Sequence, residues 1–593
     1  MIDLHLLLSA FQTARRELLG LRGPEGHWVG ELSSSAFATA SAAGALAIVA
    51  KQEKEDARRA AYQQLSVRAV EWLVAGQTSD GGWGDVRSGP ANLAATTLVR
   101  AAIHLTGQSQ RFADALSKAQ RFFDDQGGLA GVRRQYRADP ALLAAVLGSS
   151  ALAGITAWRD APAMGFESAW LPRGMRRALA TAAGYAEPVR VGMGQGHFFH
   201  RWPRNPLVLL FRGLSVGRSL ASLTRFQPSS GGFVESPAWT GFLVAGLAST
   251  GRADHPVARR ALNFLLDSVR SDASWPNVAS RNVGNTALAI NALASASGDV
   301  GALGCLDWLL DCQRKEASPP AVSPPGGWAC SDRDGSLPDV DDTAAALRAL
   351  SVLLKSGTDA HRPRVEAAAT AGINWLLSLQ NDDGGWPTFF RGAARGSPDA
   401  SAADLTAHAL RALRTWQYWT TDRTIDDSIR RGMYFLSATQ QPDGSWRPRW
   451  FGNGNFPGGE NPIYGTSQVV AAYRDLDQIE NRVARRGLEW LAAAVDPEGG
   501  WGGGTGDTRG PSSVEETALA VEALLAAPND PLWRPVLEAG LQWLVRAVNE
   551  GRCHQPALIG LHPPRLWYAE KAYPLAYTVS ALGQAVRLLS RPA

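Results

Sequence analysis

The chain has few of the features that mark secreted, membrane-spanning or nucleic-acid-binding proteins. Four cysteines in 593 residues, with no CxxC pair, neither form a disulfide framework nor suit a zinc ribbon. The net charge is only +4 and the arginines are scattered, whereas a nucleic-acid surface needs a dense basic patch. No apolar run approaches the roughly 18 residues that span a bilayer, and the first residues lack the elements of a signal peptide. We therefore expect a cytoplasmic protein with no nucleic-acid partner.

Repetition is the main feature that the sequence does have. AGINWLLSLQNDDGGW at 371–386 recurs as RGMYFLSATQQPDGSW at 431–446 and as RGLEWLAAAVDPEGGW at 486–501. Weaker copies end at Trp28, Trp83, Phe233, Trp275 and Trp328. Copies of one pattern at intervals of roughly 40 to 60 residues are typical of an array of helix pairs.

Each copy has the same physical interpretation. An apolar-periodic helix ends in Gln or its substitute, an acid-Gly-Gly turn follows, and a Trp begins the next, Ala-rich helix. The sequence thus predicts an all-α fold of helix hairpins closing into two α/α-barrel domains. We expect an N-terminal barrel over residues 1–290 and a C-terminal, catalytic barrel over 291–593. The repeated Gln and Trp residues are interpreted as packing devices that lock one hairpin against its neighbour.

An acidic cluster follows one of these turns. The sequence Asp339-Val340-Asp341-Asp342 places three carboxylates just before an Ala-rich helix, which Asp342 or Thr343 would cap. Three acids this close cannot all ionise cheaply, so at least one proton should be retained. A solvated acidic helix start is the simplest alternative for this motif alone. A calcium loop fits poorly, and a magnesium site for diphosphate would normally use DDxxD spacing.

The Q-x-x-D/E-G-G/S-W repeat and the DVDDTA segment together resemble squalene–hopene and oxidosqualene cyclases. The resemblance covers most of the chain, is weakest over residues 122–223, and implies proton-initiated (class II) terpene cyclisation without a metal or cofactor. It implies that Asp341 is the proton donor and that Asp339 and Asp342 surround it with negative charge. In SAADLTAHAL, His408 would hydrogen-bond the donor as an imidazolium, and Asp404, four residues earlier, would orient and charge the ring.

The resemblance also suggests residues that line the substrate pocket, where aromatic faces would stabilise a carbocation. Each of them has packing in the protein core as its alternative role. These candidates are Phe389, Trp450, Tyr464, Trp567, Tyr568 and Tyr573. Two positions depart from the family pattern: Cys330 stands where an aromatic is usual, and Gly284 replaces a Trp that normally opens a helix. Proton delivery therefore looks intact, while the wall that guides the cation is altered.

The expected partner is a linear, squalene-like isoprenoid. The segment 197–223 combines Phe, Trp and Leu with several Arg and fits an anchor at one membrane surface, with a buried core helix as the alternative. A homodimer is left open. Competing functions are cyclisation of a shorter prenyl diphosphate or a prenylated aromatic, a protein prenyltransferase β-subunit, and a scaffold without catalysis. No zinc ligand set for the prenyltransferase is evident.

Overall fold

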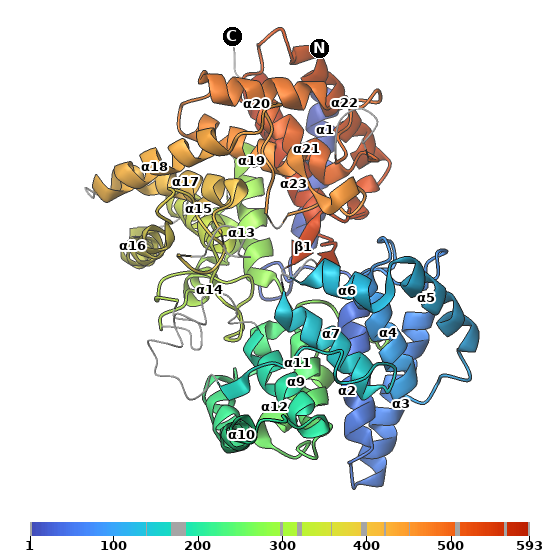
Figure 1. Cartoon of the computed structure of the whole chain (residues 1–593). Helices are drawn as coiled ribbons and strands as arrows, with labels where there is room; N and C mark the ends of the chain where they lie inside the picture. The colour runs from blue at the N-terminus through green and yellow to red at the C-terminus, as the bar shows by residue number, and fades with distance from the viewer. Residues whose placement is uncertain are drawn as a thin grey trace.

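Helices form almost all of the regular structure. The computed structural model describes residues 3–137, 139–167, 186–296, 300–316, 323–356, 359–392, 400–419, 423–449, 451–503, 510–562 and 566–590. Within these residues the only sheet pairs two short antiparallel strands, β1 (Gly560–His562) and β2 (Leu566–Tyr568). Two bodies of helices result, one drawn in blue to green and the other mainly in yellow to red (Figure 1).

The C-terminal body is a barrel of two helical layers. Its inner helices pack side by side in a closed ring, in which the last helix returns to the first. The inner helices are α13 (Asn282–Leu293), α15 (Val340–Ser356), α17 (Ala403–Trp416), α19 (Pro462–Asp475), α21 (Val514–Leu524) and α23 (Tyr573–Leu589). The outer helices are α1 (Leu4–Gly20), α14 (Leu306–Asp311), α16 (Arg362–Leu379), α18 (Arg423–Thr439), α20 (Arg482–Ala493) and α22 (Arg534–Asn549).

The first helix of the chain belongs to this C-terminal barrel. α1 packs against α22 and α23, and Figure 1 shows it in blue among the orange and red helices. The backbone N–H of Trp28, beyond α1, donates to Thr286 Oγ1 in α13 at 3.0 Å. The other barrel is thus inserted in the sequence between α1 and α13. The boundary expected at residue 290 differs from this division, because α1 and α13 both share the core of the C-terminal barrel.

The inserted N-terminal barrel repeats the same plan. Its inner helices are α2 (Ala36–Ala50), α4 (Leu93–Leu105), α7 (Pro140–Leu152), α9 (Glu187–His200) and α11 (Pro237–Ala248), and α11 closes the ring against α2. The helices outside the ring are α3 (Asp56–Val74), α5 (Ala113–Asp125), α6 (Gly128–Tyr136), α10 (Pro206–Phe226) and α12 (Pro256–Asp267). Trp275, after α12, donates its backbone N–H to Thr39 Oγ1 in α2 at 3.0 Å and so joins the two ends of this barrel.

The repeated Gln and Trp residues make the same hydrogen bonds from copy to copy. Trp386 donates its backbone N–H to Thr406 Oγ1 at 3.0 Å, which fixes the start of α17. Gln380 donates from Nε2 to the carbonyl of Gly384 at 2.8 Å and to that of Ser428 in the next outer helix at 2.9 Å. Gly384 has a φ of +88°, a conformation that glycine adopts without strain. As expected from the sequence, these residues join neighbouring hairpins.

Candidate active site

The acidic cluster forms the first turn of α15. Asp339 Oδ1 accepts the backbone N–H of Asp342 at 2.8 Å, so Asp339 caps the helix. The prediction that Asp342 or Thr343 is the cap is wrong, because the helix already begins at Val340. Thr343 instead accepts the backbone N–H of Trp328 at 2.9 Å and ties the repeat turn to the acidic turn. All three carboxylates therefore lie at the positive end of a helix dipole.

Burial is the main electrostatic influence on this cluster. It raises the pKa of each of the three carboxyl groups, and the neighbouring Asp342 raises that of Asp339 well above its usual range. The guanidinium of Arg281 lies 3.7 Å from Asp342 Oδ1 and partly offsets the rise for Asp341 and Asp342. One arginine cannot neutralise three adjacent carboxylates, so these surroundings favour retention of a proton by the cluster.

His408 lies beside the expected proton donor. Its Nε2 is 3.5 Å from Asp341 Oδ1 and 3.1 Å from the hydroxyl of Tyr464. Burial, Arg411 and Arg348 lower the pKa of His408 to about 3. This lowered pKa favours a neutral ring beside Asp341, in place of the expected imidazolium. A neutral imidazole can still donate one N–H bond to the carboxylate that remains after proton transfer.

Asp404 is buried in the first turn of α17. Burial and the nearby Asp341 raise the pKa of Asp404 to about 7, although backbone N–H groups, including that of Arg449, hydrogen-bond to it. Among the described residues, no hydrogen bond links Asp404 to His408, and Asp404 Oδ1 has no partner. The expected orientation of the imidazole by Asp404 is not observed.

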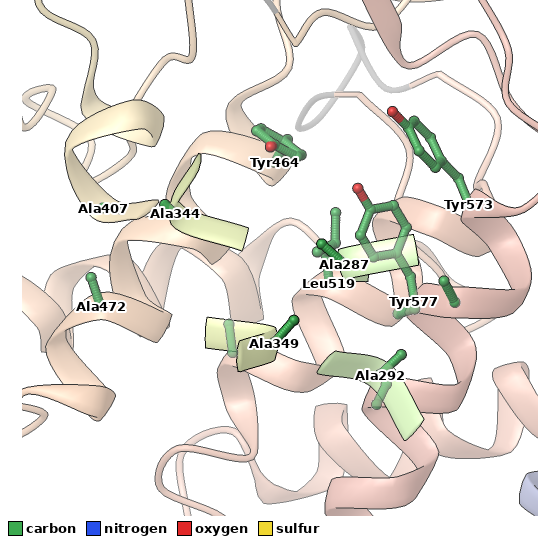
Figure 2. Packing of buried hydrophobic residues seen from close by; sticks show 14 of the residues in the cluster. Ala287, Ala292, Ala344, Ala349, Ala407, Tyr464, Ala472, Leu519, Tyr573 and Tyr577 are labelled. Atoms are coloured by element: carbon green, nitrogen blue, oxygen red, sulfur yellow. The ribbon is translucent and has the colours of Figure 1, made fainter. Parts of the chain in front are cut away.

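A cavity of about 480 Å³ adjoins the acidic turn inside the C-terminal barrel. Asp341 and His408 line it together with four aromatic rings, those of Phe451, Tyr464, Tyr573 and Tyr577. Phe451 stacks on Tyr464 with ring centres 4.0 Å apart. Figure 2 shows Tyr573 and Tyr577 on successive turns of one helix, with small alanines on the helices around them. These ring faces suit a cation that forms beside Asp341.

Two of these rings were among the sequence-based candidates and two were not. Tyr464 and Tyr573 were expected, whereas Phe451 and Tyr577 were missed. The i,i+4 spacing of Tyr577 from Tyr573 on a predicted helix could have indicated it, because such residues share a face. Trp450, expected next to Phe451, lies outside the described residues.

The remaining aromatic candidates near the C-terminus contribute less directly. Tyr568 is buried, and its hydroxyl lies 3.5 Å from that of Tyr573. Trp567 donates its backbone N–H to Asp85 Oδ2 at 3.0 Å and so links the two barrels. Neither side chain lines the cavity beside Asp341.

Phe389 and Cys330 line a second cavity, of about 130 Å³, at the junction of the barrels. Trp239 of the N-terminal barrel and Asp339 also line it, and Arg281 touches both cavities. Burial raises the pKa of the Cys330 thiol to about 12, so this position is a neutral, weakly polar wall. Of the expected pocket residues, Tyr464 and Tyr573 thus line the first cavity and Phe389 and Cys330 line the second.

Arg281 is a site residue that the sequence analysis missed, although it stands three positions before the noted departure at Gly284. A Cβ at position 284 would lie 2.4 Å from Asp342 Oδ1. The small residue therefore leaves room for the carboxylate of Asp342 and for the guanidinium of Arg281 beside it.

The fold and the site together define a helical protein of two barrels with an acid of raised pKa at the wall of an internal cavity. Family models of the squalene-hopene cyclase C-terminal and N-terminal domains match residues 279–587 and 11–193. The chain belongs to the squalene–hopene cyclase family, and thus to the class II terpene cyclases.

Individual relatives are distant. A squalene–hopene cyclase of Bradyrhizobium diazoefficiens is 25% identical, over 95% of this chain and 92% of the relative. A drimenyl diphosphate synthase of Streptantibioticus cattleyicolor is 30% identical, over 60% of this chain and 62% of the relative. The solved ent-copalyl diphosphate synthase from Streptomyces platensis superposes with a TM-score of 0.59 at 19% identity, over 98% of this chain and 99% of that one, which shows a shared fold.

Proposed function

We propose that Asp341 initiates cyclisation of a linear isoprenoid by protonating its terminal alkene. The observation that carries this proposal is the carboxyl group of Asp341, whose pKa is raised, facing an internal cavity beside His408. The O–H bond of Asp341 breaks, its proton bonds to the terminal alkene carbon, and a tertiary cation forms. The next alkene attacks this cation and closes a ring, and the final cation loses a proton or takes up water.

Fixed groups around Asp341 would stabilise the charges that this step creates. The carboxylate left on Asp341 faces the neutral His408 ring, the first-turn amides of α15 and the guanidinium of Arg281. The cation faces the rings of Phe451, Tyr464, Tyr573 and Tyr577. Asp339 and Asp342 share the remaining charge of the cluster.

Squalene is the first candidate substrate, because relatives over nearly the whole chain are named squalene–hopene cyclases. A prenyl diphosphate is the second, because a relative 30% identical over part of the chain is named drimenyl diphosphate synthase. The arginine side chains that line the cavity favour this second, anionic candidate.

The test is direct conversion by the purified protein. We would incubate it with squalene, oxidosqualene and geranylgeranyl diphosphate, with and without EDTA, and identify products by mass spectrometry. Cyclic product that disappears in Asp341→Asn supports the proposal. Cyclic product that Asp341→Asn still forms at the wild-type rate contradicts the role of Asp341, and consumption of none of the three substrates counts against the cyclase.

We also propose that α10 rests on a membrane surface at the cytoplasmic face. Leu207, Leu210, Phe211 and Leu214 share one face of this helix and are 46–75% exposed. No uninterrupted apolar run in the sequence approaches the length of a membrane span. Among the described residues, α10 nevertheless has the length and composition of one, with a mean hydropathy of 1.3 and 22% of that window buried. Loss of co-sedimentation with anionic vesicles in Leu210→Glu/Phe211→Glu is expected, and unchanged co-sedimentation would refute this contact.

A further inference from the structure

The cavity beside Asp341 continues through the barrel to a cluster of charges. Arg348 on α15, Arg411 on α17 and Arg474 on α19 line this far part and are called the arginine cluster here. Asp475 and Glu522 lie among them. Arginines are rarely buried unless they are paired, so the balance of charge in this part of the cavity is informative.

Two of the three arginines are well paired. Arg411 Nε lies 2.7 Å from Asp475 Oδ2, and Arg474 Nε lies 2.9 Å from Asp475 Oδ1. Glu522 Oε1 is 3.8 Å from Arg411 and 3.7 Å from Arg474. The two carboxylates thus neutralise two guanidinium groups, and one positive charge is left over.

Arg348 carries the surplus charge. Within the described residues it has no hydrogen bond and no carboxylate within 4 Å, although it lines the cavity. Burial and the neighbouring Arg411 lower the pKa of Arg348 to about 9, so the guanidinium is still charged at neutral pH. An arginine in this setting is stabilised by an anion that enters from outside.

The distance from Arg348 to the acid suits a short isoprenoid chain. Asp341 and Arg348 are seven residues apart on α15, which places their Cα atoms about 10 Å apart along one helix face. Small and apolar side chains, among them Ala344, Ala345, Ala471 and Leu519, line the cavity with them. Figure 2 shows Ala344 and Leu519 in this region of the barrel.

We propose that Arg348, supported by Arg411 and Arg474, binds the anionic head group of the isoprenoid whose terminal alkene Asp341 protonates. This inference rests on the proposed function and adds the substrate class, an isoprenoid that ends in a diphosphate or a carboxylate. The head group remains intact, since protonation and ring closure take place at the other end of the chain. The cavity reaches the exposed side chains of Lys355 and Arg587, so the substrate enters tail first from this basic end.

The test measures binding apart from catalysis. In the Asp341→Asn background, which cannot deliver the proton, we would titrate farnesyl diphosphate, farnesol and inorganic pyrophosphate by calorimetry, with and without EDTA. We expect farnesyl diphosphate to bind at least tenfold more tightly than farnesol. Arg348→Gln should raise the Kd for farnesyl diphosphate about 10- to 100-fold, the range of a charge-assisted hydrogen bond. Arg348→Lys should restore part of the affinity.

The matched control is Arg430→Gln on the outside of α18, where Arg430 pairs with the exposed Asp427. It removes the same charge from the protein and should leave the Kd unchanged. Equal Kd values for farnesyl diphosphate and farnesol, or no effect of Arg348→Gln, would overturn the head-group site. Tight binding of pyrophosphate but not of the farnesyl compound would overturn it as well, since it would show a site for a free anion.

Failure of the proposed function can be distinguished from failure of the head-group site. In that case wild-type protein forms no cyclic product, whereas the dependence of binding on Arg348 persists in the Asp341→Asn background. Conversely, product formation from squalene with no Arg348-dependent binding keeps the cyclase and removes the head-group site.

Discussion

The two barrels share one hairpin unit but differ in what fills their rings. In the N-terminal barrel, α2 and α11 are buried along their whole lengths and consist mainly of small and apolar residues. A Cβ on Gly246 would lie 2.2 Å from the carbonyl oxygen of Gly192, so α11 and α9 touch through their backbones. In the C-terminal barrel, acids and the arginine cluster line a cavity between the inner helices.

The difference shows that the repeat itself does not create the site. The Gln and Trp contacts set the hairpin geometry in both barrels, as the matching bonds of Trp275 and Trp386 show. The side chains on the inner faces then decide whether the ring packs closed. Charged side chains are costly to bury without partners, and in the C-terminal barrel they line a cavity.

The strongest test of this contrast compares a buried acid from each barrel. Asp341→Asn should lower the cyclisation rate about 1,000-fold, because the proton donor is lost, and should leave thermal stability nearly unchanged. Asp85→Ala in the N-terminal barrel should lower thermal stability, because it removes the acceptor of the Trp567 backbone N–H, but should preserve the rate per folded molecule. Product formation and melting curves measure both. A folded Asp85→Ala protein without activity would break the contrast.

Added volume should be tolerated differently by the two rings. Gly246→Ala should lower the free energy of unfolding by about 1–3 kcal/mol, because its methyl group meets the backbone of α9. Ala345→Leu should cost less than about 1 kcal/mol, because its side chain enters the cavity, but should slow turnover. Urea titrations and product assays are the measurements. Equal destabilisation by both would show that the second ring is packed as tightly as the first.

The neutral state of His408 gives a pH prediction. Because the pKa of His408 is about 3, this ring should stay neutral between pH 5 and 8 and should add no inflection to the pH profile of activity. Activity should fall as the pH rises through the raised pKa of Asp341, since the acid must hold its proton. His408→Gln should reduce turnover about tenfold while leaving the shape of the pH profile intact. An inflection near pH 6 that disappears in His408→Gln would show that an imidazolium is required.

The smallest expected effect concerns the buried carboxyl of Asp404. Folding raises the pKa of Asp404 from 3.8 to about 7, so the stability it contributes is complete below pH 4 and is lost as the pH rises through 7. Asp404→Asn should therefore flatten the decline in melting temperature between pH 5 and pH 8, by a few degrees at most. Melting curves recorded at pH 5 and at pH 8 test this prediction. Asp382→Asn, a substitution at an exposed site, is the control. Parallel declines in wild type and Asp404→Asn would contradict the raised pKa.

Local patterns in the sequence were sufficient for much of this fold. The helix, Gln, turn and Trp order predicted the hairpins because each contact lies within one repeat or between neighbours, as for Trp386 with Thr406. The position of α1 in the C-terminal barrel was not predictable in this way. Trp28, which follows α1, contacts Thr286 across the inserted barrel. No local sequence pattern indicates a contact between residues so far apart in the chain.

The sequence by itself determined the hairpin repeat, the acidic turn at the start of α15 and the family, because these depend on residues close together in the chain. Only the tertiary structure decided the lowered pKa of His408, the free carboxyl oxygen of Asp404 and the pairing of Arg411 and Arg474 with Asp475 and Glu522. These properties arise from burial and from charges on other helices of the ring. Such effects depend on distance in space, and the linear sequence does not record it.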